Sequence, residues 1–377
     1  MHIRKILFIL ILCLFIVKPI YITANEDTVN WTYIHAEVLS ILEDTIDEEN
    51  CTRYQKVLVD ITERDLSEQI EVENIINTAS IYKIIVKPGD EVIIVVNKTD
   101  DSIDSGRIYS YARDKYLIYL LLVFIGALIL FGGKNGLYSI ISLAICVGLI
   151  LFAFFPLILK SINPIIVVSG ISIIATFATL SIIGGFNIKT YAAIIGTIGG
   201  VITSGLLTFY FGALTHIQGI GDEDVELLSY FQKGYNLNFR DLLYAGIIIG
   251  ALGAIMDVSM SIASSMEELY ENNPRIGKNK LLKAGMRIGK DIMGTMSNTL
   301  ILAYAGNSIS MILVFFLYNR SFIQFINSDQ IAGEILRALC GSIGLIFSIP
   351  ITSFAFISIC KPKKNPYNTS KRKYTYR

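Results

Sequence analysis

Seven apolar runs fill most of the chain between Leu117 and Ile359. They cover residues 117–131, 137–155, 165–183, 190–212, 242–263, 299–317 and 335–359. An α-helix rises about 1.5 Å per residue, so about 20 apolar residues cross the roughly 30 Å hydrocarbon core of a bilayer. Hydrophobic residues make up 53% of the 377 positions, which agrees with this pattern. The sequence therefore predicts a polytopic α-helical membrane protein with about seven transmembrane helices after an N-terminal signal or anchor.

The N-terminus has the pattern of a secretory signal. Two basic residues, Arg4 and Lys5, precede the apolar run 6–17, and small residues end the segment at Ala24. Cleavage after this position and retention as an anchor both stay open, because the residue three places before the cut is a large isoleucine. We therefore predict a signal peptide or signal anchor over residues 1–24, and we expect the residues that follow to be exported.

Residues 25–115 hold no apolar run of spanning length, but they hold several short segments rich in β-forming residues. These segments are 31–42, 54–62, 70–76, 81–86 and 91–96. Val57, Val59 and Ile61 fall at every second position, which is the period of a half-buried strand. The pattern predicts a small β-rich extracytoplasmic domain, a barrel or a sandwich. Both a passive spacer or assembly module and a ligand-binding domain stay open.

The distribution of basic residues orients the predicted helices. Six basic residues lie between Arg275 and Lys290, and seven more lie in the tail 361–377. With the β-rich domain outside, alternation places both segments in the cytoplasm, in agreement with the positive-inside rule. The predicted organisation is a signal at 1–24, a β-rich extracytoplasmic domain at 25–115, a transmembrane domain at 116–360 and a basic cytoplasmic tail at 361–377.

One acidic residue, Asp257, lies inside the apolar run 242–263. Small and polar residues step from it by three or four positions and so share one helical face: Gly246, Gly250, Gly253, Asp257, Ser261, Ser264 and Glu268. A carboxylate in a spanning helix costs about 2.5 to 3.5 kcal/mol on insertion scales unless it faces protein or water. We therefore expect Asp257 to point inward.

A second polar stripe follows on the next segment, where Asp291, Thr295 and Asn298 are spaced by four and three residues. Intramembrane ionisable residues commonly mark transport or proton pathways. The candidates for an ion or proton pathway are Asp257, Glu268, Asp291, Thr295 and Asn298. A buried polar tie from Asp257 to Asn298 or to a serine is the alternative.

Several glycines are expected to serve helix packing, since a missing side chain lets two backbones approach closely. They are Gly196, Gly200, Gly246, Gly250 and Gly253.

The sequence gives no support for nucleic-acid binding, for a disulfide framework or for a cofactor. It contains no GxSxG, HExxH or GxxxxGK[ST] motif, so we do not expect an enzyme. Six of the eight methionines lie between Met256 and Met296, where adaptable packing is a simpler explanation than a soft-metal site. His216 and the acidic residues after it match no defined metal site, and no metal is predicted.

Three segments closely resemble the YibE/F family of bacterial multi-pass membrane proteins. They read GALGAIMDVSMSIASSMEEL from Gly250, GKDIMGTMSNTLILAYAG from Gly289 and EILRALCGSIGLIFSIPIT from Glu334. The resemblance implies a signal, a small extracytoplasmic domain and a membrane bundle from about residue 117 to residue 360. It implies no particular substrate.

The chain is also similar, more distantly, to the membrane domains of SecD/SecF and of RND-type proteins. The matching positions are Gly250 to Asp257, then Glu267 or Glu268, then Thr295 to Thr299. That resemblance implies export driven by proton flow. The chain departs from it in having additional predicted spans and only a small external domain.

The sequence therefore favours a permease-like or transporter-like membrane protein, coupled to protons or ions. The alternative is a non-transporting membrane scaffold or assembly protein. An intramembrane hydrolase is least favoured, because Asp291 would have to serve as the second aspartate. The expected partners are the lipid bilayer, an unknown substrate or ion, and a homo-oligomer or a second family member.

Overall fold

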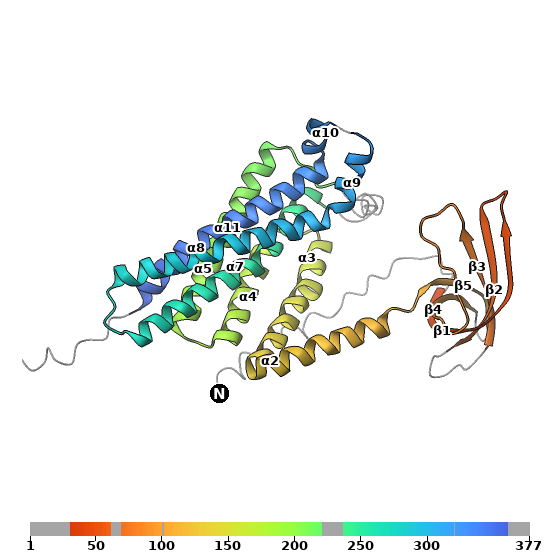
Figure 1. The fold of residues 1–377 in the computed structure, drawn as a ribbon, viewed down its shortest axis with the longest axis horizontal. Coiled ribbons are helices and arrows are strands. Elements are labelled where there is room, and N and C mark those ends of the chain that lie inside the picture. The colour runs from red at the N-terminus through yellow and green to blue at the C-terminus, as the bar shows by residue number, and fades with distance from the viewer. Residues whose placement is uncertain (1–30, 62–68, 100–101, 221–236, 320, 361–377) are drawn as a thin grey trace, which may run out of the picture. The chain divides into compact units, whose positions relative to one another are not determined.

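The structure is a computed structural model, and it describes residues 31–61, 69–99, 102–220, 237–319 and 321–360. The predicted signal and the basic tail lie outside the described residues. Two compact units divide the chain between Ala127 and Leu128. One contains the β-strands and the start of the first helix, and the other contains the remaining helices (Figure 1).

The β-rich domain is a closed five-stranded barrel with the strand order β1-β2-β3-β5-β4. Its strands are β1 (Trp31–Asp47), β2 (Thr52–Ile61), β3 (Gln69–Asn77), β4 (Glu91–Thr99) and β5 (Ser102–Tyr111). Neighbouring strands are antiparallel except β3 and β5, which are parallel. The alternation at Val57, Val59 and Ile61 is confirmed, because all three side chains lie in the barrel core.

The strand predicted at residues 81–86 is wrong. Side chains, rather than a strand ladder, bind the backbone of this segment: Asn74 donates to the Ile84 oxygen (2.7 Å), and Tyr111 donates to the Ile85 oxygen (2.6 Å). Val86 donates its N–H to the Gln55 side chain at 3.3 Å. The strand that completes the barrel is β5, which the sequence reading missed.

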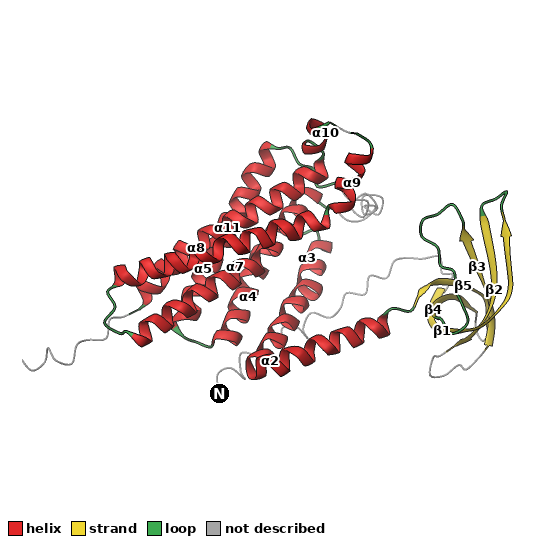
Figure 2. Cartoon of the chain, in the orientation of Figure 1, coloured by secondary structure: helices red, strands yellow, loops and turns green. Residues whose placement is uncertain are grey.

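Helices make up the rest of the described chain (Figure 2). They are α2 (Asp114–Leu149), a π-helical turn (Ile150–Phe154), α3 (Phe155–Leu159), α4 (Pro164–Gly184), α5 (Ile188–Leu214), α7 (Phe239–Asn272), α8 (Lys278–Asn307), α9 (Ile309–Leu317), α10 (Phe322–Ile326) and α11 (Asp329–Ile359). Helical geometry is interrupted inside α2 at Gly133, where φ is 54° and ψ is −126°. A glycine adopts such a positive φ without the steric penalty that a Cβ would bring.

Five helices of the described chain are long and apolar enough to cross a membrane, or six if the bent pair α8 and α9 counts as one span. The membrane protein predicted from the sequence is confirmed. In this count the predicted spans 117–131 and 137–155 belong to one helical stretch of 46 residues, Asp114–Leu159. That stretch is about twice as long as a bilayer requires, and its helical geometry breaks at Gly133, between the two predicted spans.

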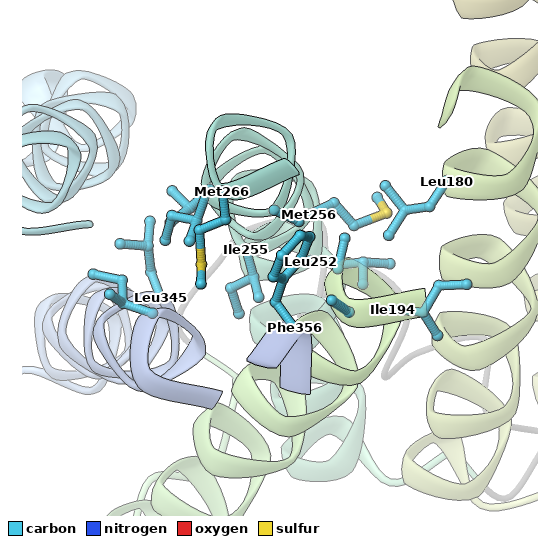
Figure 3. Packing of buried hydrophobic residues seen from close by; sticks show 14 of the residues in the cluster. Leu180, Ile194, Leu252, Ile255, Met256, Met266, Leu345 and Phe356 are labelled. Atoms are coloured by element: carbon cyan, nitrogen blue, oxygen red, sulfur yellow. The ribbon is translucent and has the colours of Figure 1, made fainter. Parts of the chain in front are cut away.

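Helix α7 contacts α4, α5, α8 and α11, so it lies at the centre of the bundle. Its apolar side fills the main core; Figure 3 shows Met256 of α7 extending toward Leu180 of α4, with Ile194 of α5 and Phe356 of α11 nearby. This arrangement decides which face of α7 is buried and which is left outside.

Helices α5 and α11 form the most extensive helix pair. A Cβ added at Gly196 would collide with Thr352, and one added at Gly200 would lie 2.8 Å from the Gly344 oxygen. The same close approach continues at Ser204, whose Cβ lies 2.7 Å from the position of a Cβ on Gly344. Contacts thus recur every four residues along both antiparallel helices, as expected of small residues that let two helix backbones approach.

Candidate functional site

The small and polar face predicted on α7 exists, but other helices of the bundle cover little of it; Gly250 lies near Tyr304 of α8. Asp257 is exposed, as are Gly246, Gly253 and Ser261. The opposite side is fully buried and carries large apolar side chains, among them Ile247, Ile255 and Ile262. The expectation that Asp257 points inward is therefore wrong, because the isoleucines fill the core and the stripe of small residues does not.

Asp257 lies near the middle of the 34-residue helix α7. Among the residues that the structure describes, its carboxylate has no hydrogen bond and no ion pair. The alternative of a polar tie to Asn298 or to a serine is thus not found in this part of the chain. What remains is a single carboxylate in an otherwise apolar segment.

The second polar stripe also points away from the bundle. Asp291, Thr295 and Asn298 are all exposed, whereas the buried residues of α8 include Gly285 and Gly289 on its other side. The Thr295 hydroxyl donates to the Ile292 oxygen of its own helix at 2.9 Å. The side chains of the two stripes share no hydrogen bond or ion pair within the described chain.

Glu268 is exposed near the C-terminal end of α7, and it makes no hydrogen bond or ion pair with the described residues. Its neighbour Glu267 instead forms an ion pair with Lys189 at 2.8 Å, with both side chains mostly buried. This contact joins the end of α7 to the start of α5. Glu268, the pathway candidate, is therefore exposed, whereas its neighbour Glu267 joins two helices.

The five glycines predicted to serve packing fall into two groups. Gly196 and Gly200 lie against α11, and a Cβ on Gly250 would lie 2.7 Å from the Tyr304 hydroxyl. Within the described part of the chain, Gly246 and Gly253 have no heavy atom within 4 Å of an added Cβ. Packing within this chain explains the first group but not these two.

Sequence reasoning missed a charged cluster at the N-terminal end of α11. Arg337 donates to Glu334 at 2.8 Å, and its guanidinium carbon lies 5.8 Å from the centre of the Tyr304 ring. Tyr304 is the residue that contacts Gly250, so the cluster joins α7, α8 and α11. The signal was present, since an arginine inside an apolar run seldom faces lipid.

Asp241, in the first turn of α7, is a second carboxylate that the prediction overlooked. It is buried, and it accepts hydrogen bonds from the side chains of Asn163 and Asn238, both at 2.9 Å. Asp241 is thus satisfied by the ends of two helices. Asp257 differs from it in lacking any such donor within the described residues.

Among the described residues, no group of three or more His, Cys, Asp or Glu side chains is placed to hold a metal ion. His216 is described, but the acidic residues that follow it lie outside the described residues.

A family model described as YibE/F-like protein matches residues 120–362, which is more than half of the chain. No curated protein and no solved structure matches.

Proposed function

The chain belongs to the YibE/F-like family of integral membrane proteins, and from this premise we propose that it is a permease-like protein that exchanges a proton or an ion at Asp257. The substrate is left undefined by the proposal. The observation that carries it is a lone carboxylate, exposed and without a partner in the described chain, on the central helix of the bundle.

Energetics support a role for this carboxylate beyond stability. A charged side chain near the middle of a spanning helix costs about 2.5 to 3.5 kcal/mol, and the cost falls only when water or protein covers it. Among the described residues, Asp257 makes no hydrogen bond or ion pair that would offset this cost. A carboxyl group that meets water from one side can take up and release a proton or bind a cation.

The bend between α8 and α9 supports the same proposal. The two helices meet at Ser308 with an angle of 58°. Interrupted helices form the ion sites of many transporters, and the residues on both sides of this break are exposed. The polar stripe of Asp291, Thr295 and Asn298 lies on α8, before this bend.

The test uses cells from which the gene has been deleted. A growth or transport defect of these cells that the intact protein restores is scored first. Asp257→Asn keeps the shape and removes the charge and the proton, so we expect normal insertion and expression but loss of complementation. Asn298→Ala should weaken complementation only partly. Full complementation by Asp257→Asn would refute the proposal.

The second candidate function is a non-transporting scaffold. It is favoured by the exposed aromatic surface of the barrel, where Tyr33 and Tyr109 pack edge to face with ring centres 5.1 Å apart. Exposed aromatic side chains are common in protein interfaces. Under this alternative, Tyr33→Ala with Tyr109→Ala should abolish complementation while Asp257→Asn is tolerated.

A further inference from the structure

Four basic side chains share one face of the first half of α8, which we call the basic face. Lys280, Lys283, Arg287 and Lys290 follow one another at intervals of three, four and three residues, the spacing of neighbours on one side of a helix. All four are exposed, and none forms an ion pair with the described residues. The described chain therefore leaves four neighbouring positive charges without a partner.

The opposite face of the same segment is fixed against the bundle. Gly285 and Gly289 are both buried. A Cβ added at Gly289 would collide with Ile349 of α11, and one added at Gly285 would lie 2.9 Å from the Ser353 hydroxyl of the same helix. This half of α8 is thus part of the bundle wall, and the basic face is the outer side of that wall.

These two contacts set the depth of the basic face. Four residues back along α8, from Gly289 to Gly285, correspond to four residues forward along α11, from Ile349 to Ser353. In this register, residues 280–290 run beside residues 348–358 of α11 (Figure 1). That part of α11 has no charged residue, and its Phe354 is 54% exposed. The basic face therefore lies at a depth where the neighbouring helix is apolar on its outside.

The basic face also continues into a lipid-facing surface along α8 itself. Asn298 lies five turns past Lys280 and so falls on the same side of the helix, and Leu302, about one turn further, is 70% exposed. Lipid chains cover such an apolar side chain in a membrane. The four charges are therefore at the end of a lipid-facing surface, where lipid chains meet headgroups.

Helix geometry directs these side chains toward the headgroups. Side chains of an α-helix incline toward its N-terminus, which in α8 is the end away from Leu302. Lysine and arginine stems lie along apolar surface while the charged ends reach the polar layer. Lys290 is about 15 Å deeper than Lys280 along the helix, so its stem and that of Arg287 have the longest way to extend.

Carboxylates at this end of the bundle do not neutralise the basic face. Glu268 and Glu271 are exposed at the end of α7, and Asp291 is exposed on α8 beside Lys290. None of the three forms an ion pair with the basic face among the described residues. An anion from outside the chain is therefore the partner that the charge pattern fits.

We propose that the basic face of α8 binds the headgroups of anionic phospholipids. Phosphate oxygens accept hydrogen bonds from Arg287 and Lys290, and the lipid chains extend along the side of α8 that carries Leu302. Clusters of Lys and Arg next to a spanning helix attract anionic lipids in this way. The site is separate from ion exchange at Asp257, and Asp257→Asn should leave it unchanged.

The test uses the full-length protein in detergent with equal amounts of phosphatidylglycerol and phosphatidylcholine that carry the same acyl chains. Native mass spectrometry then counts the lipids of each kind that stay bound. We expect more phosphatidylglycerol than phosphatidylcholine on the intact protein. The variant with both Arg287→Gln and Lys290→Gln should lower this ratio by about fivefold for each charge removed.

The variant with both Arg275→Gln and Lys278→Gln is the matched control. It removes the same number of charges from exposed positions, but Arg275 precedes α8 and Lys278 projects from the other side of the helix. The control should keep the preference for phosphatidylglycerol. An equal loss in both variants would show attraction to overall charge and would overturn the site.

An unchanged ratio in the variant of Arg287 and Lys290 would also overturn the proposal, and it would leave the basic face to an acidic protein partner. All substituted side chains are exposed, so both variants should fold, and size-exclusion chromatography checks this. If the variant of Arg287 and Lys290 does not fold, Lys283→Gln compared with Lys278→Gln decides, since each removes one charge. Equal lipid ratios in those two would refute the site.

Discussion

At the scale of single residues, glycines show most clearly what this bundle requires. Gly200 lies where α5 meets α11, and an added Cβ would come within 2.8 Å of both the Gly344 oxygen and an Ile255 methyl group. Gly246 lies in open space on the outer face of α7. Gly200 is therefore needed for close packing and Gly246 is not, and helix periodicity alone does not distinguish the two.

Gly200→Ala should destabilise the protein, since even one methyl group forces the backbones of α5 and α11 apart. Overpacking of this kind costs about 1 to 3 kcal/mol. Gly246→Ala meets no atom and raises helix propensity, so it should be neutral or slightly stabilising. The two variants are compared by thermal unfolding in detergent, with size-exclusion chromatography as the measure of folded protein. Equal transition temperatures would contradict the packing described for α5 and α11.

The sequence predicted the polar face of α7 correctly but not its direction. The three- and four-residue spacing from Gly246 to Asp257 defines a face whatever surrounds the helix. Whether that face is inside or outside depends on which neighbours pack on the other side, and this is decided by long-range contacts of residues such as Ile255. Spacing along one helix contains no information about those contacts.

At the scale of elements, hydrogen bonds from side chains hold the barrel segment 81–86, where the sequence predicted a strand. The buried amide of Asn74 donates to Gln55 at 3.1 Å and to the Ile84 oxygen at 2.7 Å. Gln55 in turn donates to Asp44 at 3.2 Å, and Arg53 donates to the same carboxylate, which lowers the pKa of Asp44. β-Propensity predicted a strand at 81–86, because it does not detect polar groups that bind backbone from other strands.

Residues 25–112, expressed alone, should give a β-type circular dichroism spectrum and a cooperative melt, since the barrel is closed and has its own core. Within it, Asn74→Ala should cost about 1 to 3 kcal/mol, because the Ile84 oxygen loses its donor. That corresponds to roughly 4 °C or more in Tm for a domain of this size.

Asn77→Ala is the matched control for the barrel experiment. The Asn77 side chain accepts one bond, from the Ala79 N–H, in an exposed turn. Its effect on Tm should be small. A larger loss in Asn77→Ala than in Asn74→Ala would contradict the role given to the buried amide.

At the scale of the whole molecule, the sequence predicted a β-rich domain followed by a helical membrane bundle, and both are present. Composition and run length are enough for this level, because about 20 apolar residues have few alternatives to a spanning helix. The break at Gly133 lies between the predicted spans 117–131 and 137–155, next to the polar residues Lys134 and Asn135.

The outer face of α7 also concerns the whole molecule. A Cβ added at Gly246 or Gly253 would meet no heavy atom of the described residues within 4 Å. Asp257 lies between these glycines and the cytoplasmic end predicted from the sequence. Small residues beside a lone carboxylate leave room for water or for a closely packed second chain. We expect water to reach this face in the assembled protein.

The most direct measurement is labelling of Asp257 by a hydrophobic carbodiimide, which reacts with protonated carboxyl groups, in membranes that contain the full-length protein. Mass spectrometry across a range of pH should show labelling of Asp257 that falls as pH rises, and none in Asp257→Asn. Asp241, held by Asn163 and Asn238, is the internal comparison and should react little. Labelling of Asp257 that stays constant with pH, or that never occurs, would show a carboxyl group sealed from water and would contradict the account.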